Sequence, residues 1–288
     1  MSNLLVNADD FGLTPGVNRS IAELYRAHAL SSATLMATGT FFNDAVSTAL
    51  ANPILEVGCH ILLVDGTPAL PPEQIPTLCP NGQSFRPTLT AFVRDLFTFR
   101  IRASEITAEA TAQIRRLQSA GLSVSHIDTH KHTHLFSGIL RPLLAAAQAA
   151  QVPAIRNPFE PDWALGATPR TNSGSATWFR RLAVIALQSQ HRAFQRAVRA
   201  SGVATTSGTI GVLATGTLNV RETLRSLLAA LPPDPTKTWE LVCHPGYPDA
   251  ALDQVRTRLR ASRALEHEAL LELLPAIPLA SWSSLTTP

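Results

Sequence analysis

Short apolar segments alternate with amphipathic segments along almost the whole chain of 288 residues. Brief runs of small and β-branched apolar residues predict β-strands at residues 4–8, 33–37, 55–63, 124–129, 154–157, 209–213, 239–243 and 277–280. Apolar residues at helical spacing predict helices near residues 17–28, 44–51, 104–121, 138–150, 178–200, 220–231 and 253–274. Strands that alternate with helices in this way are typical of a parallel α/β sheet or barrel, and we expect one domain over residues 1–288.

Two proline-rich excursions interrupt this alternation. Residues 65–100 contain six prolines, and residues 158–174 contain three. Because proline fixes φ and lacks a backbone N–H, we expect no regular structure in either stretch. Long loops of this kind form walls or lids beside functional sites.

Composition and charge exclude several classes of protein. The formal net charge is only +3, which does not predict nucleic-acid binding. One basic helix face, made by Arg192, Arg196 and Arg199, is either a solvated surface or a contact for an anionic membrane or an acidic ligand. No apolar run is long enough to span a bilayer, and the first residues lack the features of a secretory signal, so we expect a cytoplasmic protein. Three scattered cysteines predict no disulfide framework.

Polar residues collect where the predicted strands end. Asp9 and Asp10 follow the first strand, His60 lies near the end of the third, and His244 ends a late strand. The carboxyl ends of parallel strands meet at one rim, so these residues could converge there. Each has an ordinary alternative: the aspartates could serve a helix cap and a turn, His60 could be a core histidine, and His244 a polar strand end.

A histidine-rich segment, residues 126–134, follows the strand at 124–129. Alternate side chains of a straight strand lie ~6.6 Å apart, too far for four of them to bind one ion. One or two could be ligands, while the others orient ligands or contact substrate. Chance surface histidines are the alternative, and a Cys/His zinc site with Cys59 and Cys243 is disfavoured because strand alternation turns each thiol away from its neighbouring histidine.

These residue types suit metal-assisted hydrolysis. Adjacent carboxylates repel each other, and a divalent ion could bind one and leave the other as a base. A histidine at the rim could then protonate a leaving amine. Two other hypotheses are a metal-dependent phosphoesterase or sugar isomerase, and a non-catalytic protein that binds metal or sugar.

Four motifs resemble the YdjC/ChbG/HpnK family of carbohydrate deacetylases: NADDFG at residues 7–12, VGCH at 57–60, HIDTH at 126–130 and CHPGY at 243–247. The resemblance implies a distorted (β/α) barrel that removes an N-acetyl group from an amino sugar with one divalent ion, Mg²⁺ or Zn²⁺. By this likeness the metal ligands are Asp10, His60 and His130, the catalytic base is Asp9 and the general acid is His244. We expect the other residues to bind substrate or to support the metal ligands: Asp128, His132, His134 and Arg156.

A further likeness concerns the substrate. Residues 156–161, with the sequence RNPFEP, are most similar to the hopanoid-biosynthesis branch of that family. This implies an N-acetylglucosaminyl hopanoid as substrate, and the alternative is a soluble oligosaccharide such as diacetylchitobiose. Arg156 could bind that substrate or brace the carboxylates. Family likeness also allows a homodimer, and the basic helix face allows peripheral contact with a membrane.

Overall fold

A parallel β-sheet forms the centre of the computed structural model, which describes residues 2–168 and 188–286. The order of its eight strands is β6-β5-β4-β3-β2-β1-β8-β7, and every neighbouring pair is parallel. The strands are β1 (Asn3–Phe11), β2 (Ser32–Leu35), β3 (Glu56–Ile61), β4 (Val124–Thr129), β5 (Ala154–Ile155), β6 (Ala204–Thr205), β7 (Gly208–Ile210) and β8 (Thr238–Cys243).

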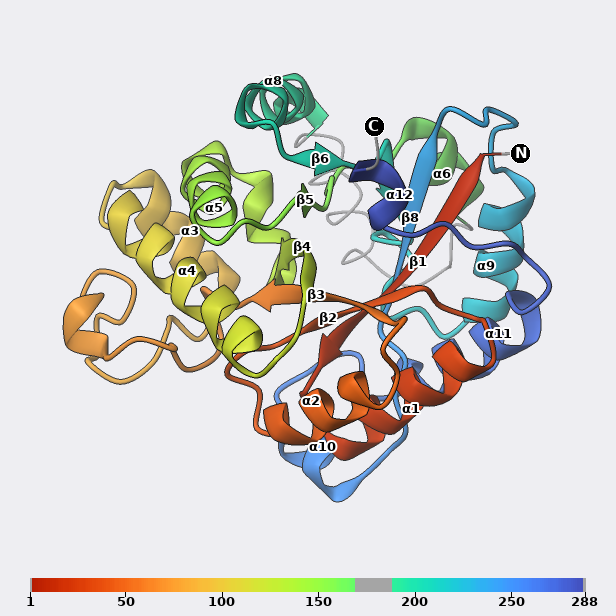
Figure 1. Cartoon of the computed structure of the whole chain (residues 1–288), viewed down its shortest axis with the longest axis horizontal. Coiled ribbons are helices and arrows are strands. Elements are labelled where there is room, and N and C mark those ends of the chain that lie inside the picture. The colour runs from red at the N-terminus through yellow and green to blue at the C-terminus, as the bar shows by residue number, and fades with distance from the viewer. Residues whose placement is uncertain (1, 169–187, 287–288) are drawn as a thin grey trace.

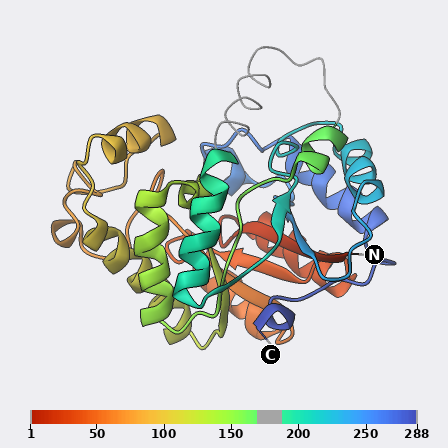
Figure 2. The same cartoon turned by 90° about the horizontal axis from the view of Figure 1, so that it is seen from above.

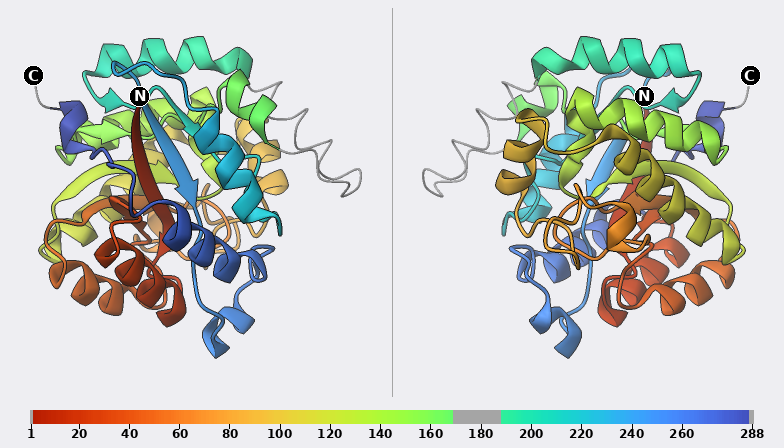
Figure 3. Two further views of the ribbon diagram at one scale, coloured as in Figure 1. Left: turned by 90° about the vertical axis from the view of Figure 1, so that its right-hand side faces the viewer. Right: turned by 90° about the vertical axis from the view of Figure 1, so that its left-hand side faces the viewer.

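The two outermost strands of this order are neighbours in the chain. Only Thr206 and Ser207 separate β6, which pairs with β5, from β7, which pairs with β8. Just beyond β5, the carbonyl oxygen of Phe159 accepts a hydrogen bond from the Thr209 amide at 3.1 Å. The sheet therefore curls on itself into the distorted barrel expected from the sequence (Figures 1 and 3).

Helices surround this sheet, with α1 and α2 below it, α4 and α5 to its left and α9 and α11 to its right in Figure 1. The helical elements are α1 (Pro15–Arg26), α2 (Phe42–Leu50), η1 (Pro72–Gln74), α3 (Leu89–Phe97), α4 (Ala103–Ser119), η2 (His130–Leu135), α5 (Ser137–Ala149), α6 (Asp162–Ala167), η3 (Gln188–Gln190), α8 (His191–Ser201), α9 (Val220–Ala229), α10 (Ala250–Gln254), α11 (Ser262–Leu273) and α12 (Ser283–Thr286). In the described part of the chain, no helix is both long and apolar enough to cross a bilayer.

Strand alternation separates an apolar outer face from a partly polar interior. In β1, Leu4, Val6 and Ala8 belong to the main hydrophobic core under the helices. Leu5, on the opposite face, joins a small interior cluster with Ala154 and Trp282. Asn7 and Asp9 share that inner face farther along the strand, so the polar groups lie toward its carboxyl end.

Several predicted elements differ from those observed. Residues 89–97 form α3 despite the proline-rich surroundings, because the last of these prolines precedes the helix and the Thr88 hydroxyl accepts from the Ala91 amide at 3.2 Å. Strand β6 and helix α6 were not predicted. Residues 277–280 contribute only one parallel bridge, between Leu4 and Leu279. The first part of the helix expected at 178–200, and the end of the irregular stretch at 158–174, lie outside the described residues.

The helix expected over residues 253–274 is broken into α10 and α11. The Arg260 guanidinium donates to the carbonyl oxygens of Leu252, Asp253 and Val255 at 3.3, 3.1 and 3.0 Å. These carbonyl groups lie at and just beyond the C-terminal end of α10, so the Arg260 side chain caps the helix where it stops.

The first proline-rich excursion is held against α4 by three buried side chains on one face of that helix. Gln113 bonds the amide and carbonyl of Leu62 at 2.9 and 2.8 Å. Glu109 accepts from the amides of Ala69 and Leu70, at 2.7 and 3.0 Å. Its neighbour one turn earlier, Glu105, accepts in the same way from residues 77 and 78. These bonds fix the excursion to α4 along two turns of the helix.

Candidate active site

The residues predicted for the site lie together at the carboxyl end of the barrel. Each sits at or just beyond the end of a strand, and all are buried except His130, whose side chain is 22% exposed, and the half-buried His132. Asp9 and Asp10 come from β1, His60 from β3, Asp128 from β4, His130, His132 and His134 from η2, Arg156 from the end of β5, and His244 from the end of β8.

Three of these side chains point ligand atoms at one another. The Asp10 Oδ1 atom lies 3.6 Å from His60 Nε2 and 3.5 Å from His130 Nδ1, and the two nitrogens are 3.3 Å apart. Two imidazole nitrogens and a carboxylate oxygen in such an arrangement form a donor set for a divalent ion. A second grouping of Asp9, His60 and Asp128 is also close, but its atoms already bind one another or Arg156.

The backbone at Asp10 explains how two consecutive aspartates reach one site. Neighbouring side chains of a regular strand point to opposite faces. Here Asp10 has a φ of 65°, and the pairing of β1 with β2 shifts register between Ala8 and Phe11. Aspartate tolerates this left-handed conformation better than most residues do, and the irregularity brings Asp10 beside Asp9 at the rim.

His60 is oriented by a carboxylate behind it. Its Nδ1 atom lies 2.8 Å from Asp128 Oδ1, which leaves Nε2 facing Asp10 and His130. A carboxylate on the far nitrogen of an imidazole is the usual support for a histidine ligand. Burial alone would lower the pKa of His60, but the carboxylate of Asp128 raises it to about 9.

Arg156 occupies the centre of the buried carboxylates. Its Nη2 and Nη1 atoms bind Asp9 Oδ1 and Oδ2 at 2.7 and 2.9 Å, Nη1 also contacts Asp128, and Nε donates to Glu240 Oε1 at 2.7 Å. The side chain is fully buried, so it braces the carboxylates and does not face the rim. Burial alone would raise the pKa of Asp9, but the Arg156 guanidinium holds it well below its usual range.

Two residues of α11 support the site from the other side. The Arg263 Nη2 atom donates to Asp10 Oδ2 at 2.5 Å, and Glu266 accepts from the His244 amide at 2.6 Å. The His244 Nε2 atom lies 3.7 Å from Asp9 Oδ2. Burial would raise the pKa of Asp10, but the charge of Arg263 holds it well below its usual range. Arg263, Glu266 and Glu240 were not among the residues predicted from the sequence.

A family model described as YdjC-like protein matches residues 3–274 of the chain. The chain belongs to the YdjC-like family. This confirms the resemblance noted in the sequence, and the four motifs that carried it all lie within the matched residues.

Curated relatives in this family match a shorter segment. The chain is 37% identical over 156 residues to a carbohydrate deacetylase of Brevibacillus brevis, covering 54% of this chain and 59% of that protein. It is 36% identical over 140 residues to a carbohydrate deacetylase of Listeria welshimeri, covering 49% and 54%. The chain thus spans little more than half the length of the curated relatives it matches.

A solved structure confirms the fold over the full length. A protein of Enterococcus faecalis V583, provisionally described as a cellobiose-phosphate cleavage protein, aligns with a TM-score of 0.73 over 99% of both chains. The two sequences are 23% identical, so this likeness establishes the architecture of the YdjC-like chain and nothing about its substrate.

The remaining histidines of this YdjC-like chain lie outside the ligand cluster. Lys131 and His132 adopt φ values of 58° and 50°, so the chain turns after β4 and the histidine run is not a straight strand. His134 bonds Thr129 Oγ1 at 2.6 Å, and burial lowers the pKa of His132 to about 3. His126 lies deeper in the barrel, stacked on Trp282 with ring centroids 4.0 Å apart.

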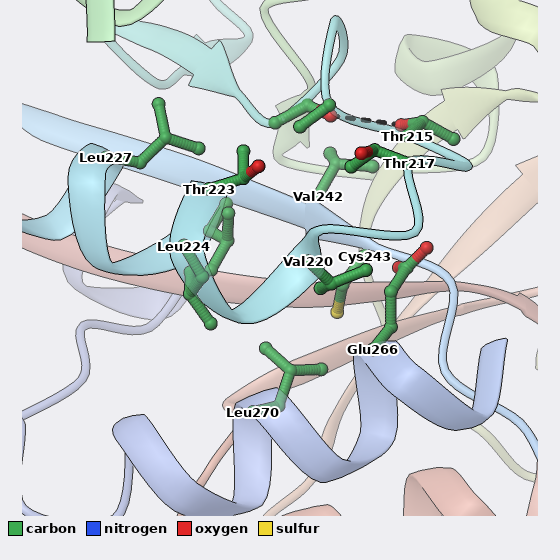
Figure 4. A pocket seen from close by; sticks show the side chains of 13 residues that line it. Thr215, Thr217, Val220, Thr223, Leu224, Leu227, Val242, Cys243, Glu266 and Leu270 are labelled. Carbon is green, nitrogen blue, oxygen red and sulfur yellow. Dashed lines mark hydrogen bonds between the residues drawn. The ribbon is translucent and has the colours of Figure 1, made fainter. Parts of the chain in front are cut away.

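Two cavities were found away from this cluster. One, of about 40 Å³, lies between β8, α9 and α11, where Cys243, Leu224 and Glu266 line it (Figure 4). It is too small for a sugar, because ligand pockets usually have several hundred Å³. The other, of about 620 Å³, opens at the opposite end of the barrel beside Val57, Val124 and the C-terminal segment. The lining described for each cavity contains none of the three clustered ligands.

Proposed function

We propose that this chain is a metal-dependent deacetylase that hydrolyses the acetamide of an N-acetylated amino sugar. The observation that carries the proposal is a three-residue ligand cluster with a second, ionised carboxylate beside it. Asp10, His60 and His130 form the cluster, and Asp9 is the adjacent carboxylate. The names of the Brevibacillus and Listeria relatives support an acetylated carbohydrate as the substrate class.

The donor set fits a divalent ion held by Asp10, His60 and His130. Two imidazoles and one carboxylate suit Zn²⁺ better than Mg²⁺, which prefers oxygen ligands and several waters. Asp128 supports His60 in this role through the 2.8 Å contact to Nδ1. When bound, such an ion supplies Lewis-acid polarisation of the acetyl carbonyl group.

Asp9 and His244 are proposed to move the protons. Asp9 accepts a proton from the attacking water, and Arg156 keeps it ionised and fixed in orientation by two hydrogen bonds. A carboxyl with a pKa held this low does not retain the proton, and Asp9 passes it on to His244. His244, 3.7 Å away, is placed to pass a proton to the sugar nitrogen as the amide C–N bond breaks. The products are acetate and the free amine.

The substrate we propose is lipid-linked, an N-acetylglucosaminyl hopanoid, on the likeness of residues 156–161 to that family branch. Part of this motif has a local structural role, since Glu160 accepts from the amides of Gly211 and Leu213, both at 2.8 Å. The alternative is a soluble oligosaccharide such as diacetylchitobiose. A homodimer and a cytoplasmic location stay predictions.

The test is acetate release from an N-acetylglucosaminyl lipid and from soluble chitooligosaccharides, each with zinc and with magnesium. Asp9→Asn should abolish turnover and leave zinc binding, measured by calorimetry, unchanged. Asp253→Asn, at a side chain that is 70% exposed, is the matched control and should keep full activity. Full turnover by Asp9→Asn would show that the proposed base is wrong.

A further inference from the structure

The segment that leaves α3 exposes two aromatic side chains to solvent. Phe97 is 65% exposed and Phe99 is 93% exposed, the highest value among the exposed large hydrophobic residues of the described chain. Three arginines flank them, Arg94, Arg100 and Arg102, with side chains that are 65%, 68% and 71% exposed. We call these five residues the α3 tip.

Neither packing nor local conformation accounts for a phenylalanine at position 99. The residue has a φ of 57°, and the Arg100 amide donates back to the Asp95 carbonyl at 2.9 Å, which is how helices end at a left-handed residue. Glycine or asparagine suits this position, whereas a bulky side chain is strained there. Phe99 gains almost no burial in return. A strained and exposed aromatic residue points to a binding role.

The charges of the α3 tip are arranged with the positive groups outward. Asp95 is buried beneath the tip and contacts Arg94 Nε at 2.8 Å and Arg100 Nη1 at 4.0 Å. Glu105, which pairs with Arg102 at 3.6 Å, is also buried. A ligand that approaches from solvent therefore meets guanidinium groups and phenyl rings before any of these carboxylates.

The α3 tip lies at the same end of the barrel as the candidate site. The Phe97 ring packs edge-to-face on Phe136, with centroids 5.8 Å apart. Phe136 directly follows η2, the turn that begins with His130. Figure 2 shows α3, in gold, at the outer margin of the molecule.

We propose that the α3 tip binds the surface of an anionic lipid bilayer. The two phenyl rings would enter the interface, and the arginines would pair with phosphate headgroups. Two phenylalanines with these exposures offer only about 300 Å² of apolar surface, whereas a stable protein interface needs about 800 Å² from each partner. The combination of a small protruding apolar group with surrounding cations fits lipid better than a second copy of this chain. The proposal does not depend on the proposed reaction.

The experiment is co-sedimentation of the full chain with vesicles of phosphatidylcholine and phosphatidylglycerol, compared with phosphatidylcholine alone. The double variant Phe97→Ser with Phe99→Gly should lower the partition coefficient by roughly tenfold or more. Glycine relieves the strain at position 99, which offsets the lost contact between Phe97 and Phe136, so the variant should unfold close to the temperature of the parent. Arg100→Gln and Arg102→Gln should each lower binding by about fivefold, and high salt should weaken the parent in the same direction.

Matched controls lie elsewhere on the surface. Ile54→Ser removes a side chain that is 82% exposed at the opposite end of the barrel, and Arg192→Gln with Arg196→Gln changes the basic face of α8. Both should leave vesicle binding unchanged.

Four results would overturn the proposal. The parent chain could bind neutral vesicles as well as anionic ones, or the phenylalanine variant could bind as the parent does. The variant could dissociate a dimer seen in sedimentation velocity, which would make the α3 tip a protein interface. It could raise KM for a soluble chitooligosaccharide without changing vesicle binding, which would make the tip a sugar-binding surface.

Discussion

Replacing Arg156 by methionine removes a guanidinium that contacts Asp9, Asp128 and Glu240 together. Methionine keeps the length and apolar stem of the side chain, so the change is mainly one of charge. Three carboxylates would then face one another in a fully buried space. We therefore expect Arg156→Met to test whether this guanidinium organises the site or merely fills it.

The expected loss follows from the burial of the network. Breaking a buried ion pair by removing one partner costs about 3–5 kcal/mol, and a chain of this size loses roughly 2 °C in Tm per kcal/mol. Arg156→Met should thus melt roughly 6–10 °C lower than the parent at about pH 8. All three carboxylates lose the guanidinium at once, which favours the upper end of that range, although Asn7, Thr34 and His60 still contact Asp9 or Asp128.

The loss should depend on pH in a definite direction. In the parent, Arg156 holds the pKa of Asp9 below its unfolded value, so this stabilisation is present above about pH 4 and is lost only as the pH falls farther. In the variant, burial without a cation raises the carboxyl pKa values above their unfolded values. The variant is therefore most stable at low pH, where these carboxyls are protonated, and it loses stability as the pH rises. The gap in Tm between the two proteins should therefore widen from about pH 5 to about pH 8.

Thermal unfolding at the two pH values measures both effects. Arg225→Met, at a side chain that is 59% exposed and paired with Glu272, is the control and should shift Tm by no more than about 1 °C. A loss below about 2 °C for Arg156→Met, or an equal loss at both pH values, would refute this account of the network.

Three further predictions concern the metal cluster and the barrel interior. Asp128→Asn should weaken zinc binding, measured by calorimetry, about 10–100-fold because it removes the support of His60 Nδ1. Since His60 has a pKa raised to about 9 and must be neutral to bind a metal, zinc affinity should rise with pH up to about that value, and a flat titration would contradict this. Trp282→Ala should lower the free energy of unfolding by about 3–5 kcal/mol in a denaturant titration, because it empties the interior beneath His126, whereas Trp282→Phe should cost less.

Much of the fold follows from local patterns along the chain. The apolar runs predicted most of the strands, and their alternation with helices predicted a parallel sheet. Strand β6 was not predictable, because it has two residues and its pairing depends on distant strands, and the distorted barrel itself was expected from the family resemblance. Helix α3 was missed because the prolines before it were taken to extend their effect to residue 100.

The candidate site was likewise predictable only in part. Asp9, Asp10, His60 and His244 were identifiable because they end predicted strands, and the structure places all four together. Selection of His130 from its neighbours came from family resemblance, since the turn in η2 is invisible to strand spacing. Glu240 could have been suspected as a site residue, because it is an acidic residue within an apolar strand.

Arg263 and Glu266 carried no such signal. They lie on α11 in a segment whose many charges are typical of a solvent-exposed helix, yet both are buried. Their contacts to Asp10 and His244 arise only because α11 packs against the loop that follows β8. A helix face acquires this role from tertiary structure, so no periodicity in the sequence could reveal it.

The charges around the two adjacent aspartates favour a bound cation. Each has its own arginine, Arg156 for Asp9 and Arg263 for Asp10, approaching from opposite sides of the rim. These two pairs are electrically balanced, which leaves Asp128 and the other buried carboxylates of the network, Glu240 and Glu266, in excess. The raised pKa of His60 is a response to these carboxylates, whereas burial is the main cause that raises the pKa of Glu240 to about 7, against the opposing charge of Arg156. A divalent ion beside Asp10 would offset it directly and displace the proton of His60, so the same charges that would be costly in an empty barrel favour a metal there.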